Sequence, residues 1–200
     1  MDTYLTLASP SQSQFTEKRS RFLAFALPVQ TENEAKECVA QYKKKYYDAR
    51  HVCYAYVIGD DGATTRANDD GEPSGTAGRP ILGQLQSHGL TYVLGIVVRY
   101  FGGVKLGTGP LGVAYKTAIC EALDQATTRE CIMTARFSIS VPYTEADCAM
   151  RFIREGEGNV ISRDFDEKGT TLLVEVRLDN EQTLKERLKK IITLQFNKMQ

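Results

Sequence analysis

Two glycine-rich segments constrain the fold of this 200-residue chain more than any other feature of its sequence. The first is residues 69–78 (DDGEPSGTAG), the second is residues 99–112 (RYFGGVKLGTGPLG), and together they hold eight of the sixteen glycines. Glycine is costly inside regular elements, so such clusters indicate loops with unusual φ angles or close backbone contacts. Because loops on a rigid scaffold often carry binding groups, both segments are candidates for a functional surface.

Strands and helices are predicted around these two segments. Residues 13–29 favour a β-hairpin that turns at 17–20. Thr31 and Glu34 have the spacing of a capping box for a helix that reaches about Tyr47. The other elements predicted for this half are strands at 51–58, 64–67 and 91–100, the last of them buried and central, and helices at 79–88 and 111–125.

The strand pattern restarts around residues 127–130, and we expect a hinge near residues 127–131. The remaining predicted elements are strands at 133–141, 158–165 and 170–178, helices at 144–155 (capped by Thr144) and 180–190, and a last strand through Ile192, Leu194 and Phe196. The order βαββαβ is typical of the ferredoxin-like arrangement. The sequence therefore predicts an α+β protein with domains at 1–128 and 131–200.

Charge and cysteine content exclude several classes of protein. The chain has 25 basic and 25 acidic residues and no basic half, so we expect neither sequence-specific DNA binding nor a strong attraction to membranes. Its five cysteines are odd in number and form no C-x-x-C pair, which favours reduced thiols in the cytoplasm. The first residues show no signal peptide, and no apolar run is long enough to span a membrane.

The second glycine-rich segment matches nucleotide-binding motifs only in part. Residues 107–112 fit G-x-G-x-x-G, but about six residues separate them from the strand and Pro110 lacks an N–H. Residues 102–107 have Walker spacing, but Thr108 stands where a lysine is required. Two interpretations stay open: an anion site at the helix start near Lys105 and Arg99, or a tight connection that needs glycine for packing.

Metal and nucleophilic chemistry find little support in the sequence. With two histidines, His51 and His88, and no metal-ligand spacing, we expect no metal and no cofactor. The acidic residues at 60–61 and 69–72 fit turns better than a magnesium site. Ser74 is outside any nucleophile motif, and we expect it to cap the next helix together with Thr76. His51 and Cys53 share a strand face and could form a thiolate pair, but a buried cysteine is the commoner case.

Several stretches together resemble the Impact/YigZ family in order and spacing. They are Asp48–His51, Cys53–Tyr56, Asp69–Gly78 with Pro80, Val98–Gly103 and Leu106–Gly109. The resemblance covers essentially the whole chain. It departs at Pro110, where many relatives carry glycine, and at Val113, where many carry a basic residue, and the second change weakens a phosphate-binding role for the helix start.

The resemblance implies a first domain similar to ribosomal protein S5 domain 2 and to a domain of elongation factor G. It implies a ferredoxin-like second domain, also similar to one in that factor. Eukaryotic relatives are translation regulators that bind a ribosome-associated activator and thereby restrain a kinase acting on an initiation factor. The length and second domain look bacterial, so this role transfers only as a theme. Some bacterial relatives have been labelled peptidases, a label that no motif here supports.

We therefore expect a cytoplasmic, non-catalytic protein that acts on translation by binding RNA, the ribosome or a translation factor. The alternative is a small-molecule hydrolase with its site between the two segments. A pocket with converging carboxylates and a perturbed titrating group would favour the enzyme, and an exposed, concave, basic sheet face the binder. The candidate residues for nucleic-acid or anion binding are Arg50, His51, Arg99, Lys105, Gly107 and Gly109, and those of the motif loop are Asp69, Asp70, Gly71, Glu72, Pro73, Ser74, Gly75, Thr76 and Gly78.

Overall fold

The computed structural model describes residues 2–189 and 196–198, and the chain divides into two compact units. Tyr4–Cys131 forms the first, called here the N-terminal unit. The chain from Ile132 on, with the first three residues, forms the C-terminal unit. The segment expected to be a hinge is occupied by a strand, β7 (Thr128–Ile132), so regular backbone pairing continues through it.

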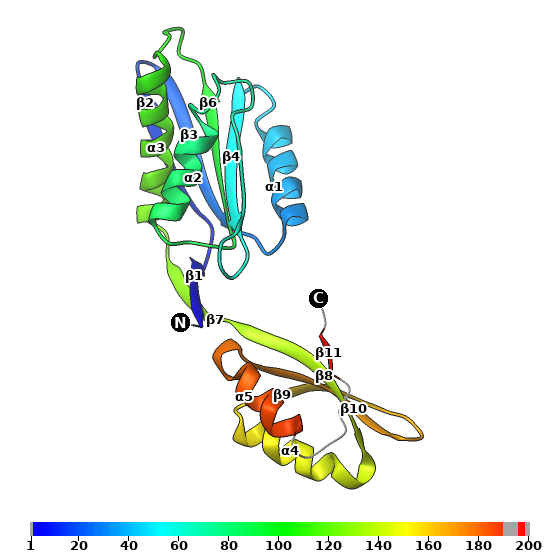
Figure 1. Cartoon of the computed structure of the whole chain (residues 1–200). Coiled ribbons are helices and arrows are strands. Elements are labelled where there is room, and N and C mark those ends of the chain that lie inside the picture. The colour runs from blue at the N-terminus through cyan, green and yellow to red at the C-terminus, as the bar shows by residue number, and fades with distance from the viewer. Residues whose placement is uncertain (1, 190–195, 199–200) are drawn as a thin grey trace. The chain divides into compact units, whose positions relative to one another are not determined.

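The N-terminal unit is built on a five-stranded antiparallel sheet in the order β2-β3-β6-β4-β5 (Figure 1). Its strands are β2 (Ser11–Glu17), β3 (Ser20–Pro28), β4 (His51–Ile58), β5 (Thr64–Asn68) and β6 (Val93–Tyr100). Every residue from Val93 to Val98 is buried, which confirms the prediction of a buried central strand. A β-branched, apolar run such as this fits a strand that is covered on both faces.

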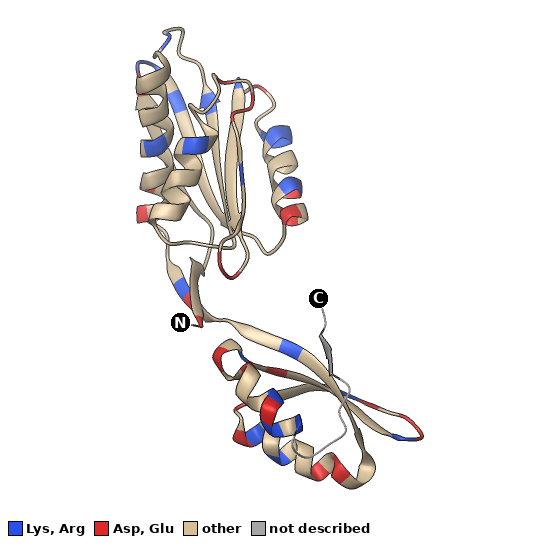
Figure 2. Cartoon of the chain, in the orientation of Figure 1, with Lys and Arg blue, Asp and Glu red and all other residues tan. Residues whose placement is uncertain are grey.

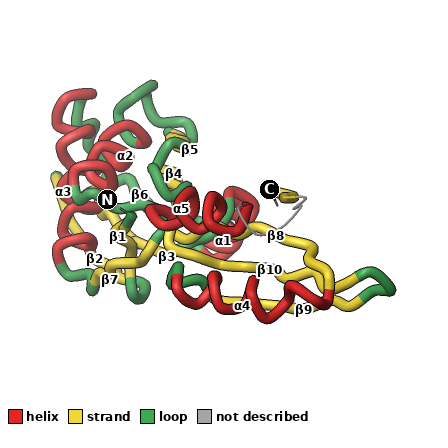
Figure 3. Tube along the Cα trace, turned by 60° about the horizontal axis from the view of Figure 1, so that its bottom comes forward, coloured by secondary structure: helices red, strands yellow, loops and turns green. Residues whose placement is uncertain are grey.

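Helices cover both faces of this sheet, α1 (Glu32–Lys45) on one side and α2 (Gly78–Ser87) with α3 (Thr108–Asp124) on the other (Figure 1). Figure 3 shows α2 and α3 side by side. Ile96 of β6 packs in the core under α1 and Val97 in the core under α2 and α3, since alternate strand residues point to opposite faces. The centre of this sheet is therefore covered on both faces, whereas Gln12, Gln14 and Thr16 of β2 and residues 64–67 of β5 are exposed.

The structure confirms the predicted start of α1 and shifts that of α3. The capping hydrogen bond predicted for α1 is present, with the Glu34 N–H donating to Thr31 Oγ1 at 3.1 Å. Helix α3 begins at Thr108, three residues earlier than predicted, because Gly107 at a φ of 82° ends the loop and Pro110 is tolerated in a first helical turn.

A two-stranded sheet of β1 (Thr3–Leu7) and β7 was not predicted. Each strand has five residues, and their partners lie more than a hundred positions apart in the chain. Local periodicity carries no information about such a pairing, because each strand alone is too short for a decisive pattern.

The described elements of the C-terminal unit follow the predicted order of strand, helix, strand, strand, helix, strand. They are β8 (Thr134–Pro142), α4 (Ala146–Glu155), β9 (Asn159–Phe165), β10 (Gly169–Arg177), α5 (Leu178–Lys189) and β11 (Phe196–Lys198), with sheet order β11-β8-β10-β9. Ile153 of α4 and Leu184 of α5 pack in one core against the sheet. The predicted Thr144 cap is wrong, because a 3-10 turn at Tyr143–Glu145 precedes α4 and no side chain caps it. Lys190, Ile192 and Leu194 lie outside the described residues.

Charge is spread over the described residues of both units. Figure 2 shows basic and acidic residues interspersed along the helices. No described helix has the length and hydropathy needed to cross a membrane.

Candidate functional site

The two glycine-rich segments meet at a pocket of about 450 Å³ in the N-terminal unit. The start of β4 and the end of β6 supply the floor on which these segments converge. The polar residues that line the pocket include Arg50, His51, Glu72, Arg99, Lys105 and Thr108, and its apolar wall includes Phe101, Leu106 and Leu111. Five of the six residues proposed for nucleic-acid or anion binding thus line one cavity, and Gly109 is the one that does not.

The carboxylate of Asp69 holds the first segment in shape. Its oxygens accept hydrogen bonds from the backbone N–H groups of Gly75 (2.8 Å), Ala77 (2.9 Å) and Gly78 (2.8 Å). Burial raises the pKa of Asp69, but these three N–H donors outweigh it and hold the pKa below its ordinary value. Gly78 is required by packing, since a Cβ there would lie 2.5 Å from the backbone nitrogen of Asn68.

Asp69 therefore takes the role that was predicted for Ser74 and Thr76. Helix α2 follows Ala77 without a side-chain cap of its own, so the prediction that these two hydroxyls cap it is wrong. The Thr76 hydroxyl instead donates to the Pro73 carbonyl at 2.6 Å. The segment is stabilised by the Asp69 carboxylate, which lies six to nine residues before the N–H groups that it accepts from. A cap is normally expected within about three residues of the helix start, so the sequence did not indicate this one.

Asp70 connects the first segment to β4 and α1. Its Oδ2 accepts from the Val52 N–H at 2.7 Å, and Oδ1 forms an ion pair with Lys43. The Asp70 carbonyl accepts from His51 Nδ1 at 2.8 Å. With the carboxylates of Asp69 and Asp70 satisfied by protein donors, their part in the acidic stretch is turn and anchor chemistry, the interpretation favoured from the sequence over magnesium.

Glu72, which lines the pocket, is the centre of a buried network. Its side chain is 4% exposed, and Oε1 accepts from Arg99 Nη1 at 2.6 Å and from the Tyr115 hydroxyl at 2.8 Å. Burial, with Cys53 and Glu72 nearby, raises the pKa of Tyr115 well above its ordinary value, so this hydroxyl stays a neutral donor.

Arg99 does not have the exposed position that a contact to a nucleic-acid backbone requires. Its side chain is 6% exposed, and its guanidinium lies near the rings of Phe22 (5.5 Å) and Phe101 (5.6 Å). The ion pair with Glu72 compensates its charge. Its Nε is nevertheless buried without a hydrogen-bond partner.

His51 presents one nitrogen to the pocket region in a defined form. A carbonyl oxygen can only accept, so Nδ1 carries the proton donated to Asp70, and in the neutral ring Nε2 holds the lone pair. Nε2 lies 3.7 Å from Glu72 Oε2. This arrangement places a basic nitrogen beside a buried carboxylate.

Cys53 does not act as a thiolate partner of His51. Its Sγ is buried, donates to the Asp69 carbonyl at 3.0 Å and lies 3.4 Å from the Tyr115 hydroxyl oxygen. Burial raises the pKa of the thiol far above its ordinary value, with nearby carboxylates adding to the effect. The buried-cysteine interpretation therefore holds.

Two exposed cations remain at the pocket, Arg50 and Lys105. Neither takes part in an ion pair among the described residues. The start of α3 lies beside them, with Gly107 and Thr108 in the pocket wall and no side chain capping the helix. These groups give the pocket an excess of positive charge.

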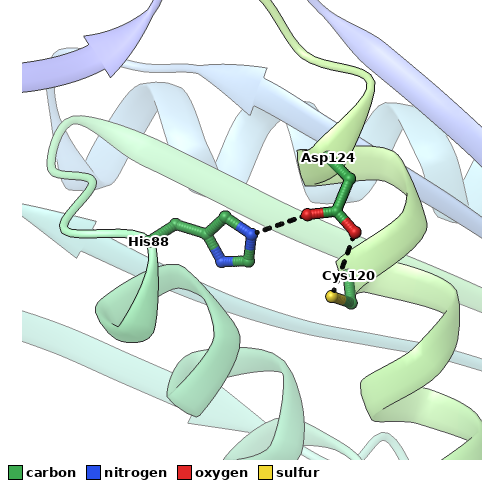
Figure 4. Close-up of side chains that lie close together, drawn as sticks. All are labelled: His88, Cys120 and Asp124. Carbon is green, nitrogen blue, oxygen red and sulfur yellow. Dashed lines mark hydrogen bonds and ion pairs between the residues drawn. The ribbon is translucent and has the colours of Figure 1, made fainter.

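A separate cluster of His88, Cys120 and Asp124 is the one group of metal-ligand type found among the described residues (Figure 4). His88 Nε2 lies 3.2 Å from Asp124 Oδ1, and the Cys120 thiol donates to Oδ2 at 3.4 Å. These hydrogen bonds, that of His88 first, lower the pKa of Asp124. Cys120 and Asp124 are four residues apart on α3, so the sequence alone places them on one face of the helix. The sequence did not indicate that His88, at the end of α2, lies beside them. Hydrogen bonds of His88 and Cys120 to Asp124 account for these contacts without a metal.

Comparison with known proteins links the pocket to one family. The model of the Impact N-terminal domain matches residues 18–123, a range that contains every residue lining the pocket. The Bacillus subtilis protein described as IMPACT family member YvyE is 39% identical over 144 residues, 72% of this chain and 66% of that protein. IMPACT family member YigZ of Escherichia coli is 34% identical over 167 residues, 82% of each chain. A crystal structure described only as that of a hypothetical protein matches with a TM-score of 0.76 at 30% identity, over 100% of this chain and 98% of the other.

Proposed function

The chain belongs to the Impact family, and we propose that it is a non-catalytic regulator of translation that binds RNA, the ribosome or a translation factor. We further interpret its N-terminal unit as similar to ribosomal protein S5 domain 2 and its C-terminal unit as ferredoxin-like. The translation role comes from the family resemblance, and the site suggests where the contact is made.

One observation supports the pocket as the binding surface. Arg50 and Lys105 are exposed, lack ion-pair partners among the described residues and line the pocket formed by the family motifs, although the chain as a whole has no net charge. Uncompensated cations at such a position favour contact with phosphate groups or with an acidic protein surface. Arg99 is not one of these cations, because its guanidinium is paired with Glu72 in the wall of the pocket.

Binding to purified ribosomes and to total RNA, measured at several salt concentrations, tests the proposal. The double variant Arg50→Ala/Lys105→Ala should bind more weakly and with a smaller salt dependence. Each phosphate contact that is lost reduces the number of counterions released on binding. The control Lys44→Ala/Lys116→Ala removes the same charge from exposed helix positions outside the pocket and should bind like the wild type. A wild type without affinity for either at low salt overturns the RNA and ribosome forms of the proposal, and purified translation factors then test the third.

A hydrolase is the second candidate, and the basic Nε2 of His51 favours it. Converging carboxylates and a perturbed titrating group would favour the enzyme, but Glu72 is the single carboxylate among the described lining residues. The groups with a raised pKa, Cys53 and Tyr115, are not among those lining residues. A general base at this position could take a proton from water. In a screen of phosphate esters, carboxylic esters and amides, any turnover due to this site must disappear in His51→Gln.

A further inference from the structure

A buried hydrogen-bond donor in the wall of the pocket lacks an acceptor. Arg99 Nε has no hydrogen-bond partner, although Arg99 is only 5% exposed and lines the pocket. Nη1 is bound to Glu72, and Nη2 donates to Ser20 Oγ at 3.5 Å. Among the described residues, the other buried side-chain nitrogen or oxygen without a partner is Glu145 Oε2 in the C-terminal unit. Buried polar groups are almost always satisfied, so this wall of the pocket is short of one acceptor.

The start of α3 offers further donors to the same cavity. Helix α3 has 17 residues, and its N-cap Gly107 provides no side chain, whereas Thr31 caps α1 with its hydroxyl. The first N–H groups of a helix have no partner within the helix, and its N-terminus carries partial positive charge. Pro110 has no N–H and Gly109 is not a lining residue, so this turn offers the pocket the backbone N–H groups of Gly107 and Thr108, in the wall that contains Arg99.

The charge and the size of the pocket restrict the class of ligand that it can bind. Arg50 and Lys105 add two positive charges that no described ion pair compensates, while the single lining carboxylate, Glu72, is already paired with Arg99. A dianion with several acceptor oxygens fits such a set of donors. The cavity of about 450 Å³ is larger than one phosphate group needs and lies within the usual range of small-molecule pockets, about 300–1,000 Å³. Phe101, Leu106 and Leu111 supply an apolar wall for an organic part.

We propose that this pocket binds a small organic phosphate, with the phosphate group held by Arg99 Nε, Lys105 and the first turn of α3. The proposal does not depend on the role in translation, because it concerns a free phosphomonoester rather than a macromolecule. Phosphate is favoured over a carboxylate because its three terminal oxygens can serve the guanidinium, the ammonium and the helix N–H groups together.

Titrations followed by ¹⁵N NMR test the proposal with adenosine 5′-monophosphate and ribose 5-phosphate as probes, and with adenosine as the ligand that lacks phosphate. Both phosphates should bind saturably with one-to-one stoichiometry and shift the amides of Gly107 and Thr108, and adenosine should do neither. Lys105→Gln should weaken binding about tenfold, the effect of losing one charge-assisted contact. The control Lys116→Gln, on the same helix but outside the pocket, should leave it unchanged.

An Arg99 variant would break the buried ion pair, so Thr108→Asp is the second variant. An acidic residue in the first turn is favourable for the helix, so this variant should fold normally while its carboxylate repels the phosphate. Absence of saturable binding by the wild type, or binding that neither variant changes, overturns the proposal. Binding of a 5′-phosphorylated RNA oligonucleotide without binding of either monophosphate also overturns it, and supports the RNA form of the proposed function instead.

Discussion

Glu72 of the first glycine-rich segment and Arg99 at the end of β6 form a buried ion pair, with 2.6 Å between Oε1 and Nη1 and side chains 4% and 6% exposed. The pair joins the first glycine-rich segment to the second, whose first residue is Arg99 itself. It therefore fixes the floor of the pocket and explains why two segments separated in sequence form one site. It also leaves Arg50 and Lys105, rather than Arg99, as the exposed cations of that site.

Glu72→Gln should destabilise the protein strongly. The substitution preserves shape but leaves the Arg99 charge buried without a counter-charge, and breaking a buried pair typically costs about 3–5 kcal/mol. Urea denaturation at pH 7 measures the free energy of unfolding. Glu37→Gln, at an exposed position of α1, should change it by no more than about 0.5 kcal/mol. Equal stability of the two variants would show that the ion pair is not a structural element.

Asp69 should make stability depend on pH in the acid range. Its pKa is lower in the folded than in the unfolded state, so its contribution is present above the unfolded value of about 3.9 and is lost as the pH falls through the folded value. Asp69→Asn should reduce the free energy of unfolding at pH 7 by on the order of 1–3 kcal/mol, with a smaller difference at pH 3. Denaturation curves at both pH values measure this, and a difference that does not shrink in acid would argue against the assignment.

Cys53 should be the least reactive thiol of the native protein. It is buried and its pKa is raised, whereas the other four cysteines are half-buried. Alkylation with iodoacetamide at pH 8, followed by peptide mass spectrometry, should modify Cys38, Cys120, Cys131 and Cys148 first and Cys53 only when the protein unfolds. Early modification of Cys53 in folded protein would reopen the thiolate interpretation.

Purified protein should contain neither stoichiometric transition metal nor bound nucleotide. The His88–Asp124 contact is explained by a hydrogen bond, and neither phosphate-binding fingerprint in the sequence is complete. Elemental analysis and mass spectrometry under native conditions measure both. Zinc at one ion per chain that is lost in His88→Ala would instead identify His88, Cys120 and Asp124 as a metal site.

Local features of the sequence predicted most regular elements correctly. The Thr31–Glu34 spacing predicted the start of α1, the apolar run ending at Tyr100 predicted the central strand, and the Asp166–Gly169 turn joins β9 and β10 as expected. These signals succeed because capping, periodicity and turn formation depend on residues that are neighbours in the chain. The two segments singled out by the family motifs both line the pocket.

The tertiary structure decided what each of those residues does. Arg99 and Lys105 are both basic residues of the second glycine-rich segment. Arg99 is a buried partner of Glu72, whereas Lys105 is an exposed cation. Asp69 caps α2 from outside the helix, and β1 pairs with β7, which lies more than a hundred residues further along the chain. Exposure, charge compensation and strand pairing depend on contacts between residues far apart in the chain. Local sequence therefore determined the elements, and packing determined which of their charges are free to bind.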